Sequence, residues 1–312
     1  MKPNAVAESS PRPSGAGVAA AGEAERVTSR FGDMLTLAKP RLNALVVATT
    51  AGGYYMAART AIDPLSLILT CAGTALVASG ASAFNQVEER DTVALMARTR
   101  RRPVAEGRMS PAEGRLVGAA LSGTGLGMLW LASTMSATVL AFATLAIYVL
   151  IYTPLKRRSS FSTVVGAVPG ALPPLVGWAG AGGSLAVIEP WVLFLIMFVW
   201  QLPHFLAIAW MYRDDYARAG LPMLPVVDRT GAVTGRQAAL WAGTLVPFSV
   251  LPSALHLTGN VYAVGALLLG LAQLALAIQF AASRTNANAR LLFYGSITYL
   301  PLLWLLMCAG RA

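Results

Sequence analysis

Long apolar segments, each close to the length that crosses a lipid bilayer, recur along almost the whole chain. A helix needs about 20 mostly apolar residues to span the hydrocarbon core. Of the 312 residues, 56% are hydrophobic and 12% are charged, a composition too apolar for a soluble globular domain. The sequence therefore predicts an all-α membrane protein with nine transmembrane helices. The predicted segments are 40–59, 64–86, 113–132, 135–154, 161–181, 188–211, 237–257, 260–281 and 290–309.

Basic residues alternate between the connections of these segments. The N-terminal flank and the second, fourth, sixth and eighth connections carry clusters of Lys and Arg, whereas the first has Arg59 alone and the third, fifth and seventh have none. By the positive-inside rule this places the N-terminus in the cytoplasm and the C-terminus outside, which requires an odd number of spans. This topology explains the net charge of +10. The expected partner is therefore the lipid bilayer, and no nucleic acid is expected to bind.

The N-terminal residues 1–33 differ from the rest of the chain. They are rich in Ala, Gly, Pro, Ser and Glu and lack the continuous apolar stretch of a signal peptide. We expect a disordered tail over 1–33, followed by a single transmembrane domain over 34–312. Glutamates in the tail also argue against an acid-poor organelle transit peptide. A bacterial cytoplasmic (inner) membrane is the simplest location.

Acids and bases meet where the second apolar segment ends, in the stretch Asn85–Pro103. Glu88 and Glu89 lie three and four residues after Asn85, and so share a helix face with it, while Asp91 does so only if the helix end unwinds. Carboxylate and amide oxygens suit Mg²⁺, and guanidinium groups bind phosphates. The pattern is typical of a metal–diphosphate site, but charged helix ends also serve as cytoplasmic anchors. The arginines of the stretch are Arg90, Arg98, Arg100, Arg101 and Arg102.

A second acidic pair, Asp214 and Asp215, closes the sixth segment. The connections after segments two, four, six and eight share one membrane face, so their charges can converge. The two acidic loops are separated by four segments, which suggests a four-helix unit used twice, with one acidic loop from each half facing a shared cavity.

Polar residues inside the segments are few, and each is a functional hypothesis. His204 lies mid-segment, one residue after Pro203 and near Trp200. It is either a structural histidine bonded to a carbonyl that the proline frees, or a residue that faces a substrate. The Gly- and Pro-rich fifth segment favours close packing or a broken helix, and both indicate an internal pocket.

Six stretches of the chain carry a resemblance to a known family. Over about residues 34–309 the chain resembles the haem O synthase (protohaem IX farnesyltransferase) family of the intramembrane prenyltransferase superfamily. The Asn/acid stretch is shared by the superfamily, whereas PHF and AGxPMLPVV separate this family from quinone and chlorophyll prenyltransferases. The stretches are AKPR at 38–41, Asn85–Pro103, YTPLKR at 152–157, the GAVPGALPPLVGWAG that follows, WQLPHF at 200–205 and DYARAGLPMLPVV at 215–227.

The resemblance implies nine transmembrane helices around a central cavity, with acidic loops after helices 2 and 6 on the cytoplasmic side. It also implies that farnesyl diphosphate, bound through Mg²⁺, ionises, and that its allylic cation alkylates a vinyl group of haem b to give haem O, the haem A precursor. Haem A synthase is then a candidate partner. The main alternative is a prenyltransferase for another, quinone-type ring acceptor; a transporter is a further one, but its coupling charges would lie near the bilayer midplane.

The resemblance also implies residue roles. Asn85, Glu89 and Asp91 would hold one Mg²⁺, and Asp214 and Asp215 a second. His204 and Trp200 would face the haem. The departing diphosphate would be neutralised by Arg98, Arg102, Lys156 and Arg157. Together these residues make up the predicted catalytic and binding site.

Two positions depart from the family pattern. Glu89 replaces the usual Asp, and Val93 stands where the family has a carboxylate eight residues after the Asn. On a continuous helix Val93 would lie near the face of Asn85, so its apolar side chain would remove one metal ligand. We expect Glu88 to supply the missing oxygen.

Overall fold

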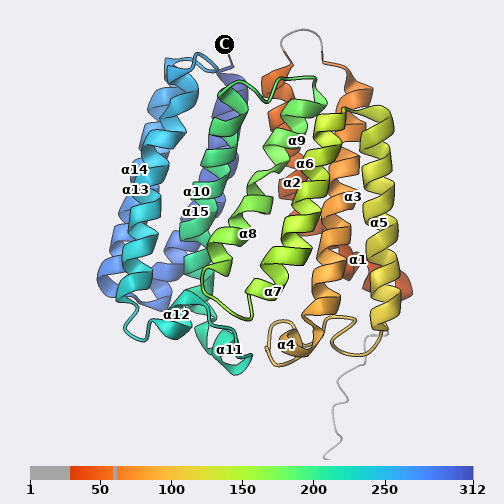
Figure 1. Cartoon of the computed structure of the whole chain (residues 1–312). Coiled ribbons are helices and arrows are strands. Elements are labelled where there is room, and N and C mark those ends of the chain that lie inside the picture. Colours follow the sequence, from red (N-terminus) through yellow and green to blue (C-terminus); the bar gives the residue numbers. More distant parts are fainter. Residues whose placement is uncertain (1–28, 59–61, 312) are drawn as a thin grey trace, which may run out of the picture.

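The computed structural model describes residues 29–58 and 62–311, and the regular elements of this part are all helices (Figure 1). Long helices run side by side as a bundle. The short helices α4, α7, α11 and α12 gather at one end, and the C-terminus lies at the other (Figure 1). The elements are α1 Arg30–Ala38, α2 Pro40–Ala57, α3 Pro64–Glu88, α4 Arg90–Ala94, α5 Pro111–Ala132, α6 Met135–Ala146, η1 Ile147–Tyr152, α7 Thr153–Leu155, α8 Ser162–Ala171, α9 Pro173–Gly180, α10 Glu189–Met211, α11 Arg213–Arg218, α12 Leu224–Val227, α13 Ala232–Ala254, α14 Asn260–Ser283 and α15 Asn286–Ala309.

Seven helices of the described part are long and apolar enough to cross a membrane. Helices α2 and α13 are not among these seven, but they pack within the same bundle, α2 against α3 and α9, and α13 against α10 and α14. The prediction of an all-helical membrane bundle is thereby confirmed. The count of nine spans stays a prediction.

The predicted boundary at residue 33 lies inside a helix. Residues 1–28 of the expected tail lie outside the described residues, but Ser29 caps α1 by accepting a hydrogen bond from the Gly32 amide. Asp33 is buried and accepts a hydrogen bond of 2.9 Å from Arg108. The ordered domain therefore begins before residue 34, because Asp33 is a buried partner rather than a solvated acid.

Two of the predicted spans have irregular backbone. The fourth changes from α-helix to the π-helix η1 at Ile147, and π-helical turns occur frequently at functional sites. The fifth is divided into α8 and α9 at Leu172, just before Pro173 and Pro174, which cannot donate the hydrogen bonds of a continuous helix.

A cavity of about 190 Å³ lies between these irregular helices and α2, α3 and α10. Its wall is mostly apolar, as expected from the Gly- and Pro-rich fifth segment. Gly166, Pro169, Gly170, Pro173 and Val176 of α8 and α9 form one side of it. Tyr148, Gln201 and Phe205 contribute from η1 and α10.

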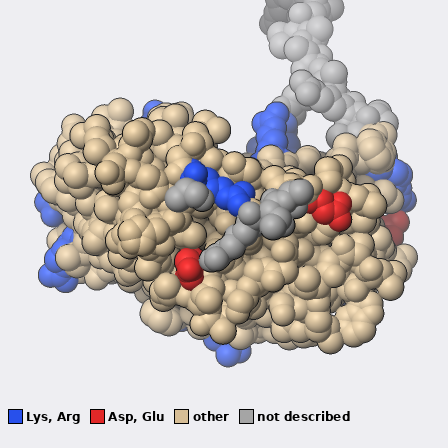
Figure 2. Space-filling model, turned by 90° about the horizontal axis from the view of Figure 1, so that it is seen from above, with Lys and Arg blue, Asp and Glu red and all other residues tan. Residues whose placement is uncertain are grey.

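Charge is distributed unevenly between the two ends of the bundle. The end that carries the C-terminus exposes a surface made mainly of uncharged residues (Figure 2). The basic connections that contain Arg98–Arg102 and Lys156–Arg158 lie at the opposite end, with α4, α7 and α11 (Figure 1). This asymmetry follows from the sequence, in which every second connection between the apolar segments carries the basic residues.

Helices α2 and α9 approach each other so closely that their contact requires glycine. A Cβ built on Gly177 would lie 1.8 Å from the carbonyl oxygen of Thr50, and one built on Gly53 would lie 2.1 Å from the carbonyl oxygen of Pro174. Both neighbours are backbone atoms, which cannot rotate away. The bend at Pro173 is therefore held against α2 by backbone packing.

We expect Gly177→Ala to destabilise the fold by about 1–3 kcal/mol or more, because the added methyl group overpacks this contact. Gly123→Ala is the matched control, since a Cβ there meets no atom within 4 Å and the helix gains propensity worth up to about 1 kcal/mol. Thermal unfolding in detergent measures both. Equal melting temperatures for the two variants would contradict the close packing.

Candidate active site

The end of α3 separates the side chains of the three neighbouring acids. The helix ends at Glu88, Glu89 is its C-cap, and α4 begins at Arg90. Asn85 and Glu89 are buried and turn inward. The side chain of Glu88 is half exposed and lies 3.7 Å from Arg115 on α5, while Asp91 is exposed beside Arg90. Of the predicted metal ligands in this stretch, the structure brings Asn85 and Glu89 together.

Glu89 forms a buried ion pair with Lys156. The lysine Nζ donates to both carboxylate oxygens, at 3.0 and 3.1 Å, and the two side chains are 4% and 13% exposed. Lys156 follows the π-helix, so the fourth predicted connection supplies the partner of an acid from the second. The predicted convergence of these two connections is present in the structure.

Asn85 is oriented by the same irregular segment. Its Nδ2 donates to Thr153 Oγ1 at 3.2 Å, and that hydroxyl donates in turn to the carbonyl oxygen of Tyr148 at 2.8 Å. With the amide nitrogen engaged, Oδ1 is the acceptor that Asn85 offers to a ligand. Because Tyr148 also lines the cavity, the polar site adjoins the apolar space.

Glu89 and four basic side chains form one electrostatic cluster. The charges of Arg102, Glu89, Lys156 and Arg98 all act on Lys39, and those of Glu89 and Arg98 act on Arg102. Burial, with Arg102 as the next contributor, lowers the pKa of Lys39 to about 7. One carboxylate among four basic groups leaves an excess of positive charge, which is the environment that a polyanion such as diphosphate requires.

Lys39 was missed as a site residue, because the alternation of charge explained it as part of the N-terminal flank. Its backbone is left-handed, with φ 49° and ψ 59°, between α1 and α2. Asn43 donates to the carbonyl oxygen of Ala38 at 2.7 Å and to Ser79 Oγ at 2.6 Å, which ties this turn to α3. The signal in the sequence was the AKPR stretch.

Apolar packing joins the two acidic loops, and Val93 is part of it. Val93 is buried with Met96 against Tyr216, Leu221 and Met223 of the α11–α12 region. Helical spacing had predicted Val93 near the face of Asn85, and this expectation is wrong because α3 ends five residues earlier. The role of Glu88 as a substitute ligand stays a prediction, with its carboxylate facing Arg115.

The loop that carries the arginines is held at three points. Thr99 donates to the carbonyl oxygen of Val93 at 2.9 Å, Arg108 pairs with Asp33, and the Arg98 guanidinium lies 4.9 Å from the centre of the Tyr212 ring. Tyr212 directly precedes α11. The arginine loop and the second acidic loop are therefore neighbours.

The two aspartates of the second acidic loop have different environments. The side chain of Asp215 is 13% exposed and pairs with Arg218, whereas that of Asp214 is 85% exposed and lies 4.0 Å from Arg213. Arg157 donates to the carbonyl oxygen of Glu88. Asp215 is thus the inward-facing acid, while Asp214 faces solvent.

The donor set is compatible with a hard divalent cation. Within the described residues there is no group of three His, Cys, Asp or Glu side chains placed to hold a metal ion. Mg²⁺ does not need one, because it is usually held through one or two carboxylates, substrate phosphate oxygens and water. Asn85, Glu89 and Asp215 offer the sheltered oxygens for this arrangement.

His204 faces α15 rather than the cavity. Its ring stacks between Trp200 and Phe293, with centroids 5.1 and 5.0 Å away, and its Nδ1 lies 2.7 Å from Ser296 Oγ. The same hydroxyl lies 2.6 Å from the carbonyl oxygen of Phe293, to which it donates. The haem-facing role of His204 and Trp200 stays a prediction.

The fold is a helical membrane bundle, and a basic site that contains carboxylates lies at the mouth of an apolar cavity. These features define an integral membrane protein suited to bind a diphosphate with an apolar tail. Residues 45–305 match the model of the UbiA prenyltransferase family, and the chain belongs to this family. The seven helices long and apolar enough to cross a membrane and this match make it a multi-pass membrane enzyme.

Individual relatives support the assignment. The chain is 44% identical to a protein of Solibacter usitatus named protoheme IX farnesyltransferase, over 89% of this chain and 98% of that protein. It is 42% identical to one of the same name from Salinibacter ruber, over 86% and 95%. A digeranylgeranylglyceryl phosphate synthase structure superposes with a TM-score of 0.75 at 16% identity, over 90% of this chain and 98% of that chain. A UbiA homologue of Archaeoglobus fulgidus, bound to GPP and Mg²⁺, superposes at 0.58 with 15% identity, over 88% and 99%.

The charge surrounding the buried ion pair predicts an asymmetry between its two partners. Glu89→Gln leaves Lys156 buried among other cations and is expected to cost about 3–5 kcal/mol. Lys156→Met should cost less, because Arg102 and Lys39 still compensate Glu89. Thermal unfolding of both variants and of the double variant, whose cost should fall below the sum, measures this. A larger cost for Lys156→Met would contradict the proposed excess of positive charge.

Proposed function

We propose that this protein transfers the farnesyl group of farnesyl diphosphate to a vinyl group of haem b and so forms haem O. The observation that carries the proposal is the buried Glu89–Lys156 pair, clustered with further basic side chains beside an apolar cavity. The proposal is supported by family membership and by relatives named protoheme IX farnesyltransferase. Haem O is the precursor of haem A in terminal oxidases, and haem A synthase is the expected recipient.

In the first step the bond between the allylic carbon and the diphosphate oxygen breaks, and the electron pair leaves with the diphosphate. Negative charge develops on its oxygens, so fixed cations stabilise the transition state more than the ground state. The proposal assigns this role to Lys39, Arg98, Arg102 and Lys156, and to Arg157, which donates to the carbonyl oxygen of Glu88. Lys39 is an addition to the set that the sequence predicts.

The allylic cation is then captured by the vinyl group of haem b. The new carbon–carbon bond leaves a cation on the porphyrin side chain; water adds to it and loses a proton, which gives the hydroxyethylfarnesyl group. The apolar wall formed by α8, α9 and α10 excludes water from the first cation, so that the vinyl group reacts before water does.

Mg²⁺ is the proposed cofactor, with Asn85, Glu89 and Asp215 as its protein ligands. When bound, it supplies further positive charge to the leaving diphosphate. The proposal is supported by the chemistry of the three sheltered oxygens and by the fold similarity to the homologue that was bound to GPP and Mg²⁺. Glu88 and Asp91, whose side chains are more exposed, are kept as secondary candidate ligands, and the solvent-facing Asp214 is left out of the proposed ligand set.

His204 is the proposed contact on the haem side. The bond to Ser296 engages Nδ1, so Nε2 is the ring nitrogen proposed to meet the iron. Trp200 is fixed by donation to the carbonyl oxygen of Ser296 at 2.9 Å and supports the histidine ring.

The acidic loops are proposed to face the cytoplasm of a bacterial cell, with the protein in its inner membrane. The concentration of basic residues at their end of the bundle supports this orientation. Reporter fusions after Gly107 and Thr230 should report a cytoplasmic location, and a fusion after Gly259 an external one. Finding Gly107 and Thr230 on opposite sides would refute a site built from both loops.

Pigment analysis of membranes that express the protein tests the function. Haem O should appear beside haem b. Asp215→Asn and Lys39→Met should lower its formation by about 10²-fold or more, because each removes a charge from the metal–diphosphate site. Asp214→Asn is the matched control and should retain activity, since its carboxylate faces solvent.

Other outcomes of that experiment would redirect the proposal. Wild-type protein that is folded but forms no haem O, and prenylates an aromatic acid instead, would favour the quinone-type alternative. Equal loss in Asp214→Asn and Asp215→Asn would return Asp214 to the metal site.

A further inference from the structure

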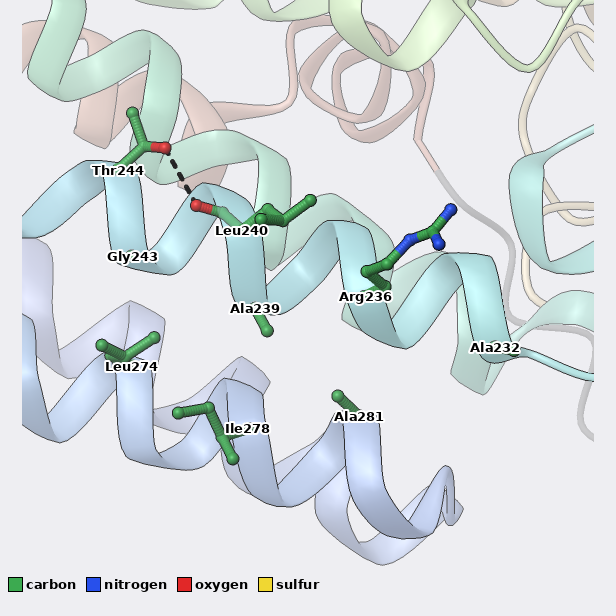
Figure 3. Close-up of a pocket in the computed structure, with 9 residues that line it drawn as sticks. All are labelled: Ala232, Arg236, Ala239, Leu240, Gly243, Thr244, Leu274, Ile278 and Ala281. Atoms are coloured by element: carbon green, nitrogen blue, oxygen red, sulfur yellow. Dashed lines mark hydrogen bonds between the residues drawn. The ribbon is translucent and has the colours of Figure 1, made fainter.

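An open groove runs between α13 and α14 (Figure 3), and none of the residues that line it belongs to the candidate active site. It has a volume of about 730 Å³. Ala239 and Gly243 form its floor on α13, and a Cβ at Gly243 would meet a single atom, Leu274 Cδ1, at 3.8 Å. Leu274, Ile278 and Ala281 of α14 form the facing wall (Figure 3).

The groove has the polarity of a membrane leaflet. Leu240 and Ile278 are exposed along it, and the Thr244 hydroxyl is satisfied by the carbonyl oxygen of Leu240 at 2.9 Å. From Arg236 to Thr244 the apolar part of the groove extends about 12 Å, from a rise of 1.5 Å per residue. This length covers most of one leaflet of the hydrocarbon core, about 15 Å, which is the depth that one acyl chain occupies.

Two arginines lie at the end of the groove that is next to the short helices α11 and α12 (Figure 1). Arg236 stands on the α13 wall with its guanidinium directed away from α14 (Figure 3). Arg284 is the C-cap of α14, three residues after Ala281, and its Cδ would lie 3.4 Å from a Cβ at Gly231. Both are exposed, and neither makes an ion pair or side-chain hydrogen bond with any residue that the structure describes.

We propose that this groove binds an anionic phospholipid, with an acyl chain between α13 and α14 and the headgroup at the end of the groove that carries Arg236 and Arg284. The apolar length matches a lipid chain, and the unpaired cations are at the depth where the headgroup begins. Basic pockets between transmembrane helices bind anionic headgroups in this manner. A zwitterionic lipid fills the groove equally well but lacks the net charge that two guanidinium groups favour.

The test is lipid retention by the purified full-length protein in native mass spectrometry. Phosphatidylglycerol and phosphatidylcholine with identical chains are added at equal concentration, and phosphatidylglycerol should be retained in preference. The double variant R236Q/R284Q should lose roughly 30-fold in phosphatidylglycerol affinity, from about 1 kcal/mol per basic residue. The control R41Q/R158Q removes two exposed arginines elsewhere and should retain the lipid.

A second variant tests the chain-binding part of the site. Gly243→Leu leaves both arginines in place but fills the groove floor, where the nearest atom belongs to a flexible side chain. It should lower phosphatidylglycerol retention while the melting temperature without lipid stays near that of the wild type. Equal retention of both lipids by the wild type, or unchanged retention in R236Q/R284Q, overturns the proposal. So does a dimer mass that R236Q/R284Q abolishes, because the groove is then covered by a second copy of the chain.

Discussion

The ion pair between Glu89 and Lys156 is the interaction on which the site depends. Taking a carboxylate and an ammonium group out of water costs several kcal/mol each, and their attraction offsets this cost only when the geometry is good. Lys156 donates to both oxygens of Glu89, and Arg102 and Lys39 lie within electrostatic reach. The basic side chains near Glu89 therefore offset the cost of burying its carboxylate. They also leave a surplus of positive charge, which a bound diphosphate would neutralise.

Irregular backbone places these charges. An uninterrupted α-helix would continue past Ile147, but the π-helix η1 shifts the register so that Thr153 contacts Asn85 and Lys156 contacts Glu89. The break at Pro173 opens the cavity on the same side, and the glycine contact with α2 holds it. Inside a membrane such irregularity is tolerated where it is buried in protein or lines a cavity. The least regular helices thus border the polar site.

The sequence predicted the class of protein and the concentration of charge at one end of the bundle. Both follow from the length of the apolar segments and from the alternation of basic residues between the connections. The choice among adjacent acids could not be predicted in this way. Whether Glu88 or Glu89 turns inward depends on the residue at which α3 ends, and helix ends are uncertain by a few residues in any sequence pattern. The misplacement of Val93 has the same origin. Lys39 was not predicted as a site residue, because the sequence does not distinguish a lysine that flanks a membrane span from a lysine that belongs to the site.

The packing of Val93 has a consequence for how the two halves of the site stay together. Its cluster with Met96, Tyr216 and Met223 joins the loop after α3 to the loop after α10, and these loops carry Glu89 and Asp215. A carboxylate in place of Val93 would be introduced among buried apolar side chains, where an unpaired charge is costly. In this chain the position therefore serves to fasten one acidic loop to the other. The distance between the inward acids is then set by hydrophobic packing as well as by any metal ion they share, so the two loops stay joined when no metal or diphosphate is bound.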